Sequence, residues 1–171
     1  MAVFGGDGEI IPDHEADWRF KSDRLLGVEL SADKGPMGTS NYFISLEAIP
    51  VGNQSFIHLT YSYVLGMSGN LATKAYLTSA GRNKVGFTQT GTGGTQQSSN
   101  YIGGIRGMLE RNTMRYYLAI DTYLGSLSDP SIKRLQNWFA ATERYPLQLQ
   151  EISRNAYLKM KQAELRRMGD I

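Results

Sequence analysis

The sequence contains no cysteine, and this absence excludes disulfide scaffolds, thiolate metal sites and cysteine nucleophiles. Histidine occurs only twice, so few side chains can act as a general base or an imidazole ligand near neutral pH. No apolar run approaches the length that a helix needs to cross a bilayer. Residues 1–7 show neither the basic region nor the apolar region of a signal peptide, so none is expected in them.

The length and composition are those of one folded domain. The 171 residues are enough to bury a hydrophobic core without a metal or a disulfide. Hydrophobic residues make up 41% and charged residues 20%, a balance typical of globular chains and not of disordered or membrane-spanning ones. We therefore predict a single domain over residues 1–171.

The charges are distributed unevenly along a chain whose net charge is only +2. Residues 1–33 carry eight acids and three bases, whereas residues 106–171 carry eleven bases and seven acids. Such a basic segment could attract polyanions or an anionic membrane. Because its bases alternate with Glu143, Glu151 and Glu164, a solvated helical face is favoured and no nucleic-acid partner is predicted.

Three consecutive strands are predicted between residues 24 and 64. Residues 25–30 and 41–49 alternate between apolar and polar side chains, and turn-rich segments at residues 33–38 and 50–54 separate the runs. Loops this short cannot make the crossover that parallel neighbours need, so the strands should form an antiparallel meander.

The faces of the second and third strands depend on how they pair. With Ile49 opposite Ser55, neither face is polar, and both faces should be at least partly covered. One face would then carry Tyr42, Ile44, Leu46, Phe56 and His58. The other would carry Phe43, Ile49, Ile57, Leu59 and Tyr61.

Helical spacing dominates the second half of the chain. A short helix is predicted at residues 68–80, with Ser68 or Asn70 as its N-cap, followed by strand character at residues 84–90 and a polar loop at residues 91–100. A long amphipathic helix is predicted at residues 104–126, a second begins after Asp129 and Pro130, and a last one covers residues 147–168. This order predicts an α+β domain with helices packed on one side of the sheet.

The common catalytic and nucleotide-binding motifs are missing. No nucleophile elbow, Walker loop or zinc-protease motif occurs, and the glycine-rich residues 90–94 lack the Gly-Lys-Ser/Thr ending of a phosphate loop. His14 lies in an acidic segment whose spacing matches no zinc or calcium pattern, so a solvated segment is favoured over a metal site. We predict no metal and no cofactor.

A few polar residues lie at positions that suggest a functional role. His58 is in mid-strand, where it either lines a cavity or is a hydrogen-bonded core residue. Glu110 can pair with Arg106 one helical turn away, which leaves Arg111 and Arg115 in need of solvent, carboxylates or an anion. Asn112 lies in the apolar stripe of the long helix beside Tyr116, so it belongs either to a buried hydrogen-bond network or to the polar anchor of a pocket.

Four runs of the sequence resemble a family of uncharacterised proteobacterial proteins. They are SFIHLTYSY at residues 55–63, AYLTSAGRNKVGF at residues 75–87, ERNTMRYY at residues 110–117 and WFAATERYP at residues 138–146. That family is similar in pattern to the START-like, Bet v 1-like superfamily of polyketide cyclases and lipid-transfer proteins. The resemblance covers about residues 20–165, while the helix at 68–80 and the helices after Leu127 depart from the superfamily pattern.

The resemblance implies a helix-grip fold, in which a curved antiparallel sheet holds a long helix over an apolar cavity. It also implies an exported, periplasmic protein whose native chain extends upstream of the present sequence. We therefore expect a small apolar or amphipathic, lipid-like ligand between sheet and long helix. The candidate cavity residues are Tyr42, Phe56, His58, Tyr61, Glu110, Asn112, Arg115 and Tyr116.

Two other functions stay open at this point. The same cavity could serve a cyclase or hydrolase, with His58 as the general base and Glu110 or an arginine stabilising the negative charge that develops in the reaction. Alternatively, the basic last helix with Arg166 and Arg167 could contact an envelope partner or an anionic membrane. No catalytic residue is assigned, and the oligomeric state is not predicted.

Overall fold

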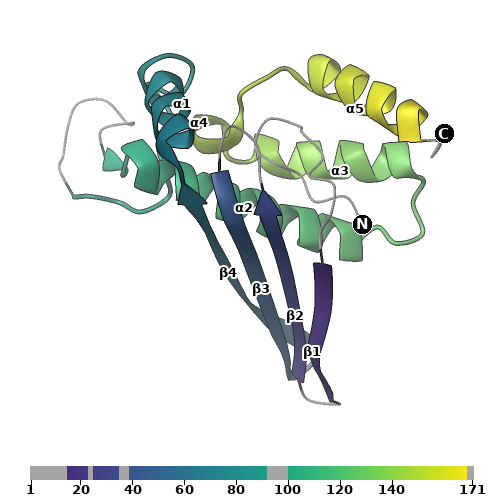
Figure 1. Cartoon of the computed structure of the whole chain (residues 1–171). Coiled ribbons are helices and arrows are strands. Elements are labelled where there is room, and N and C mark those ends of the chain that lie inside the picture. Colours follow the sequence, from purple (N-terminus) through teal and green to yellow (C-terminus); the bar gives the residue numbers. More distant parts are fainter. Residues whose placement is uncertain (1–14, 23–24, 35–38, 92–99, 169–171) are drawn as a thin grey trace. The chain divides into compact units, whose positions relative to one another are not determined.

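The chain is described by a computed structural model (Figure 1). It describes residues 15–22, 25–34, 39–91 and 100–168, and of residues 15–22 and residue 168 the backbone alone. The strands are β1 (Glu15–Ser22), β2 (Leu25–Lys34), β3 (Thr39–Val51) and β4 (Gln54–Leu65). The helices are α1 (Met67–Thr78), α2 (Gly104–Leu124), α3 (Ser131–Glu143), α4 (Pro146–Leu149) and α5 (Arg154–Met168).

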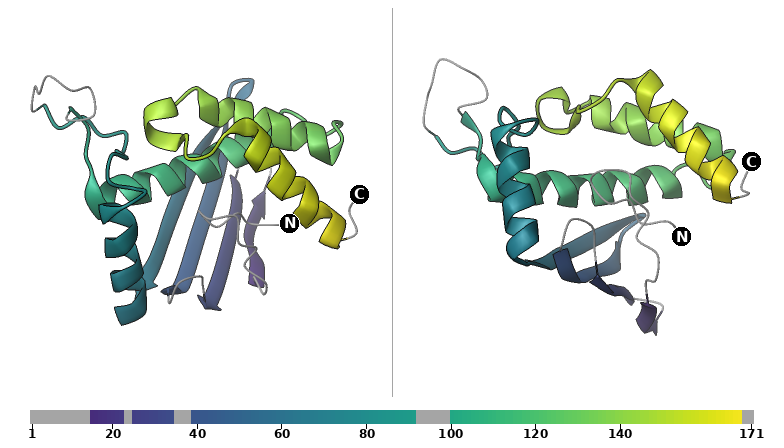
Figure 2. Two further views of the ribbon diagram at one scale, coloured as in Figure 1. Left: turned by 90° about the horizontal axis from the view of Figure 1, so that it is seen from above. Right: turned by 45° about the horizontal axis from the view of Figure 1, so that its top comes forward.

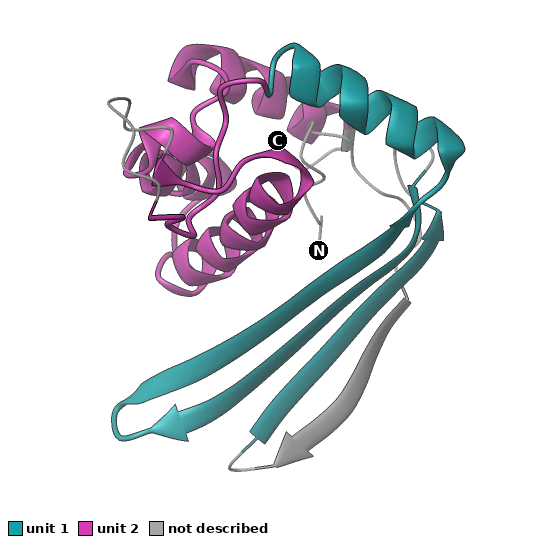
Figure 3. Cartoon of the chain, turned by 90° about the vertical axis from the view of Figure 1, so that its left-hand side faces the viewer, with its two compact units in different colours: residues 1–81 teal, residues 82–171 magenta. Residues whose placement is uncertain are grey.

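The chain divides into two compact units (Figure 3). Unit 1 covers residues 1–81 and holds the sheet and α1, while unit 2 covers residues 82–171 and holds the other helices. The predicted α+β class is confirmed. A single domain over residues 1–171 stays a prediction.

The sheet of unit 1 is an antiparallel meander in the order β1-β2-β3-β4. The three predicted strands correspond to β2, β3 and β4, and the structure adds β1 at the edge beside β2. Short connections between successive strands produce this topology, as the sequence predicted.

A two-residue turn joins β3 to β4. Val51 pairs with Gln54, and the turn residue Gly52 has φ of 64°, a left-handed conformation that favours glycine in tight hairpins. The strand therefore continues through Pro50, and Ile49 pairs with Phe56. The predicted pairing of Ile49 with Ser55 is wrong by one residue, because the hairpin turn is shorter than the expected five-residue loop.

This shift separates the sheet into an apolar and a polar face, because successive side chains of a strand point to opposite sides. The apolar face carries Leu26, Val28, Leu30, Ala32, Tyr42, Ile44, Leu46, Ala48, Ile57, Leu59, Tyr61 and Tyr63. The polar face carries Glu29, Ser31, Ser45, Glu47, His58, Thr60 and Ser62, together with Phe43, Ile49 and Phe56.

Burial follows the same division. The side chains named on the apolar face are all buried or half-buried, whereas Pro50 and Ser55, at the hairpin end of that face, are exposed. On the polar face, Glu47, His58, Thr60 and Ser62 are exposed, and so are Ile49 and Phe56. The prediction that neither face is polar is therefore wrong, since the correct register produces the alternation of an antiparallel sheet with one wet side. Among the side chains named on that side, only Glu29, Phe43 and Ser45 are half-buried.

Helix α1 follows directly from the end of β4, as both views of Figure 2 show, and packs against that strand. Its N-cap is Gly66, which contributes no side-chain bond, so the predicted caps Ser68 and Asn70 are wrong. At its other end the Gly81 N–H donates to the Tyr76 carbonyl at 2.8 Å. A Cβ atom on Gly81 would overlap the Tyr76 ring, which explains why glycine stands there.

In unit 2 the long helix is confirmed as α2, which ends at Leu124. The second predicted helix is α3, with Pro130 as its N-cap residue in place of Asp129. The predicted last helix is two helices, α4 and α5, separated by residues 150–153. Ser153 explains the interruption, because its hydroxyl accepts a hydrogen bond from the Ala156 N–H at 3.3 Å, as an N-cap does.

The predicted strand at residues 84–90 is wrong. That segment makes one isolated bridge, between Gln89 and Tyr101. Backbone bonds also link Thr88 to Ile102 and Thr90 to Asn100. Most of the predicted loop at residues 91–100 lies outside the described residues.

The core of unit 2 lies between α2, α3 and α4, and Figure 2 shows α3 running alongside α2. Leu118, Ala141 and Leu149 are buried in it, and Phe87, Met114, Trp138 and Tyr145 pack around them. Within the described residues, no helix has both the length and the apolar character that crossing a membrane requires.

Candidate functional site

Three tyrosines gather on the apolar face where β3 begins and β4 ends. The ring centroids of Tyr42 and Tyr63 are 5.2 Å apart in a stacked arrangement, and Tyr61 lies 6.2 Å from Tyr42 and 5.4 Å from Tyr63. We call Tyr42, Tyr61 and Tyr63 the tyrosine cluster. Burial, and after it the neighbouring Tyr42, raises the pKa of the Tyr63 hydroxyl, so this group stays protonated at neutral pH.

The tyrosine cluster combines apolar rings with polar ends. The Tyr42 hydroxyl is 2.7 Å from the Thr39 hydroxyl, and either oxygen can donate. Along the strands, the apolar face continues as a half-buried aliphatic surface that includes Leu30, Leu46 and Leu59. An aliphatic surface that ends in phenolic hydroxyls suits a molecule with an apolar body and a polar end.

Only two of the four predicted unit 1 residues lie in this cluster. Tyr42 and Tyr61 are there, and Tyr63 was missed, although an alternation of two residues from Tyr61 along β4 indicates it. Phe56 and His58 lie on the polar face instead, because of the register shift. The His58 Nδ1 atom is 3.3 Å from the Glu47 carboxylate, and its side chain is 62% exposed.

Glu110 in unit 2 is a structural anchor. Its Oε2 atom accepts hydrogen bonds from the backbone N–H groups of Phe87 at 2.7 Å and Thr88 at 2.9 Å, and its Oε1 accepts one from the Thr88 hydroxyl at 2.7 Å. The predicted pairing with Arg106 is present at 3.6 Å. Burial by itself would raise the pKa of Glu110, but these hydrogen bonds and the Arg106 charge outweigh it and hold the pKa below its usual value.

Asn112 and Arg115 belong to one hydrogen-bond network. Arg115 donates to the Asn112 side-chain oxygen at 3.1 Å and to the Glu151 carboxylate at 2.7 Å. These contacts favour the interpretation of Asn112 as a network residue. Arg111, on the same helix, is fully buried.

Helix α2 carries two stripes on opposite sides. Met114 and Leu118 belong to the stripe that packs into the core of unit 2. A second stripe, formed by Leu109, Thr113, Tyr116 and Ile120, recurs at the same helical spacing about half a turn away, and its side chains are half-buried. The predicted cavity residue Tyr116 belongs to this second stripe.

No cluster of three or more histidine and acidic side chains able to hold a metal occurs in the part of the chain that the structure describes. The His14 segment lies outside the residues whose side chains are described, and so does most of the glycine-rich loop at residues 90–94.

Comparisons with protein-family models, with curated proteins and with solved structures gave no significant match for this chain. The similarity to START-like proteins therefore stays a prediction from the sequence.

Proposed function

We propose that this protein binds a small apolar or amphipathic, lipid-like molecule on the apolar face of the unit 1 sheet. The observation that supports the proposal is the segregation of the two faces of the sheet. One side collects leucines, isoleucines and the tyrosine cluster, while the other is mainly polar and carries Phe43, Ile49 and Phe56 as its apolar exceptions.

The physical reason is the free energy of burying apolar surface. Each Å² removed from water contributes about 25 cal/mol, so an aliphatic surface spread over three strands can hold a lipid-sized chain without any catalytic group. The tyrosine cluster would define the orientation of the ligand, with its rings against the apolar body and its hydroxyls at the polar end.

We further propose the helix-grip arrangement, with the second stripe of α2 covering the apolar face and the ligand between them. Two features support it. Among the described residues of unit 1, α1 is the one helix, and it packs on β4. The apolar side chains of β2 and β3 therefore need another part of the protein, or a ligand, to shield them from water. The second stripe, for its part, lies on the side of α2 away from the core of unit 2.

A pair of neighbouring substitutions tests the ligand site. Leu59→Gln places an amide on the apolar face, and Thr60→Gln places the same amide on the polar face one residue later. We expect Leu59→Gln to weaken binding of a fluorescent fatty acid by about tenfold or more, because it removes buried apolar contact. Thr60→Gln should leave the binding unchanged.

Binding would be measured by fluorescence titration, and native mass spectrometry of freshly purified protein would show any ligand that it retains. Circular dichroism would verify that both variants are folded. Equal binding by the two variants, or no binding by the wild-type chain, would refute the ligand proposal.

The helix-grip arrangement has its own test, because the chain has no native cysteine. Spin labels would be attached to cysteines replacing Tyr116 and Leu59 in one variant, and Tyr116 and Thr60 in another. Since residues 59 and 60 point to opposite faces, the Leu59 pair should show the shorter distance by pulsed electron resonance if α2 covers the apolar face. A shorter distance for the Thr60 pair would contradict this arrangement.

A further inference from the structure

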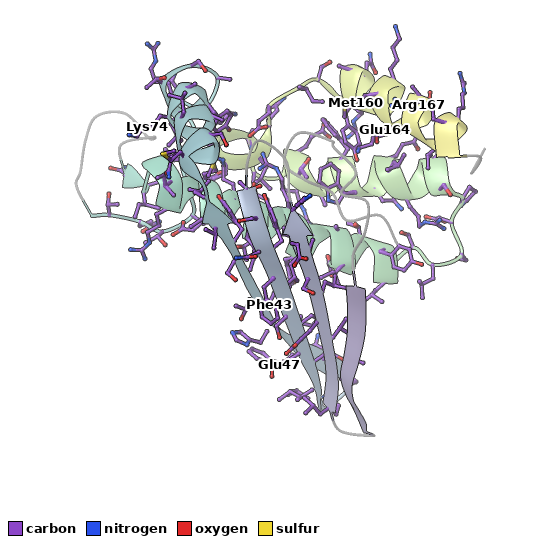
Figure 4. All side chains as sticks on the ribbon, viewed as in Figure 1. Phe43, Glu47, Lys74, Met160, Glu164 and Arg167 are labelled. Carbon is purple, nitrogen blue, oxygen red and sulfur yellow. The ribbon has the colours of Figure 1, made fainter. Side chains whose placement is uncertain are left out.

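Helix α1 exposes large apolar side chains to solvent. Met67 is 93% exposed and Leu71 is 71% exposed, and the two lie one helical turn apart. Lys74, also exposed, lies three residues after Leu71 and continues the same stripe. Figure 4 shows Lys74 on α1. We call Met67, Leu71 and Lys74 the outer stripe of α1.

The other side of α1 faces inward. Gly69 is buried, and Ala72, Thr73, Tyr76 and Leu77 are half-buried. Met67 and Leu71 therefore take no part in packing the helix on β4. Large exposed apolar side chains in a cluster mark sites of interaction, because water is a poor surrounding for them.

The charge along β4 and α1 has one sign. Between Glu47 and the end of unit 1 at Gly81 the sequence has no acidic residue, and its one lysine or arginine is Lys74 on α1 itself. An anionic lipid surface attracts bases and repels acids, and it also takes up apolar side chains at its headgroup boundary. An acid-free segment around an exposed apolar stripe fits the lipid surface.

We propose that the outer stripe of α1 docks this protein on an anionic membrane surface. Met67 and Leu71 enter the boundary between headgroups and acyl chains, and Lys74 lies at the level of the anionic headgroups. This docking surface goes beyond the ligand-binding proposal and does not depend on it, because the stripe lies on α1 and outside the apolar face of the sheet.

Two other exposed regions fit a membrane less well. The β3–β4 hairpin exposes Ile49, Val51 and Phe56, but the acidic Glu47 is exposed beside it. Helix α5 presents Arg166 and Arg167, but within its described part it exposes no large apolar side chain that could insert. Both regions supply matched controls.

The test is flotation of the full chain with two kinds of vesicle, phosphatidylcholine alone and phosphatidylcholine mixed with phosphatidylglycerol. We expect the wild-type chain to bind the mixed vesicles and to be released by salt. The double substitution Met67→Ser with Leu71→Ser should weaken this binding by about tenfold or more, because two side chains lose their apolar burial. Lys74→Glu should weaken it by about fivefold or more.

The controls are Phe56→Ser on the hairpin and the double substitution Arg166→Gln with Arg167→Gln on α5, which changes the net charge by as much as Lys74→Glu does. Both should bind like the wild type. Loss of binding in either control with full binding by the α1 double variant would overturn the proposal. So would no binding by the wild type at low salt. Light scattering after gel filtration gives the last outcome: a wild-type dimer that the α1 substitutions convert to a monomer would assign the stripe to self-association instead.

Discussion

The Glu110 carboxylate on α2 accepts a hydrogen bond from the backbone N–H of Phe87, 23 residues earlier in the chain, at 2.7 Å. A second backbone bond and a hydroxyl bond from Thr88 complete the contact. One side chain therefore attaches residues 87–88 to the start of the long helix. Substitution of Glu110 by Ala would leave two backbone donors without their acceptor, and we expect a loss of about 1–3 kcal/mol in the free energy of unfolding.

The same contact predicts a dependence on pH. The folded state holds the pKa of Glu110 below its usual value, so this contribution to stability is present above the unfolded pKa of about 4.3 and is lost as pH falls from there through the folded pKa. Urea unfolding at a series of acidic pH values would measure it. The Glu110→Ala variant should lose less stability over that range than the wild type, and parallel curves would contradict the role.

Gly107 lies against backbone atoms, and a side chain there has no room. A Cβ atom would be 2.7 Å from the Ile102 carbonyl oxygen and 3.0 Å from the Gly86 nitrogen. We expect Gly107→Ala to destabilise the protein by about 1–3 kcal/mol in thermal or urea unfolding, since neither neighbour is the end of a flexible side chain. Gly103→Ala is the control for steric room, because nothing lies within 4 Å of its Cβ position. Gly103 is the N-cap of α2, where alanine is less favoured than glycine, so this change should cost at most about 1 kcal/mol.

Ser153 supplies the N-cap that begins α5. Replacing it by Ala removes the acceptor for the Ala156 N–H and should cost about 0.5–2 kcal/mol in chemical unfolding. Ser62→Ala, on the exposed polar face, also removes one serine hydroxyl, but this hydroxyl caps no helix. Its free energy of unfolding should stay within about 0.5 kcal/mol of the wild type. A similar effect at both positions would argue against the cap.

Tyr157 is buried between Trp138 and Phe139, and within the described residues its hydroxyl has no hydrogen-bond partner. Burial, and then the charge of Glu164, raises its pKa. Because the folded state favours the protonated phenol, its contribution should be intact below the unfolded pKa of about 10 and should decline as pH rises above it. Tyr157→Phe should be as stable as the wild type at neutral pH and less sensitive to alkali, as unfolding at raised pH would show.

The sequence was sufficient for those features that depend on neighbours along the chain. Alternation located β2 and β3, and turn-rich segments delimited β4. Helical spacing located α2, and cap and break signals located α1 and α3. Tyr42 and Tyr61 were also identified in this way, because both lie in strands with apolar neighbours two residues away. The capping signal of Ser153 was present in the sequence too, but the apolar residues on either side of it obscured the break between α4 and α5.

Only the tertiary structure decided which residues share a face and which distant groups meet. The turn at Gly52 is two residues long. That single fact moved Phe56 and His58 away from the face of Tyr42 and brought Tyr61 to it. Likewise, the charge of Glu110 indicated Arg106 as a partner, but the backbone donors of Phe87 and Thr88 could not be read from spacing. Strand register and long-range hydrogen bonds depend on how the chain closes on itself, which local patterns do not specify.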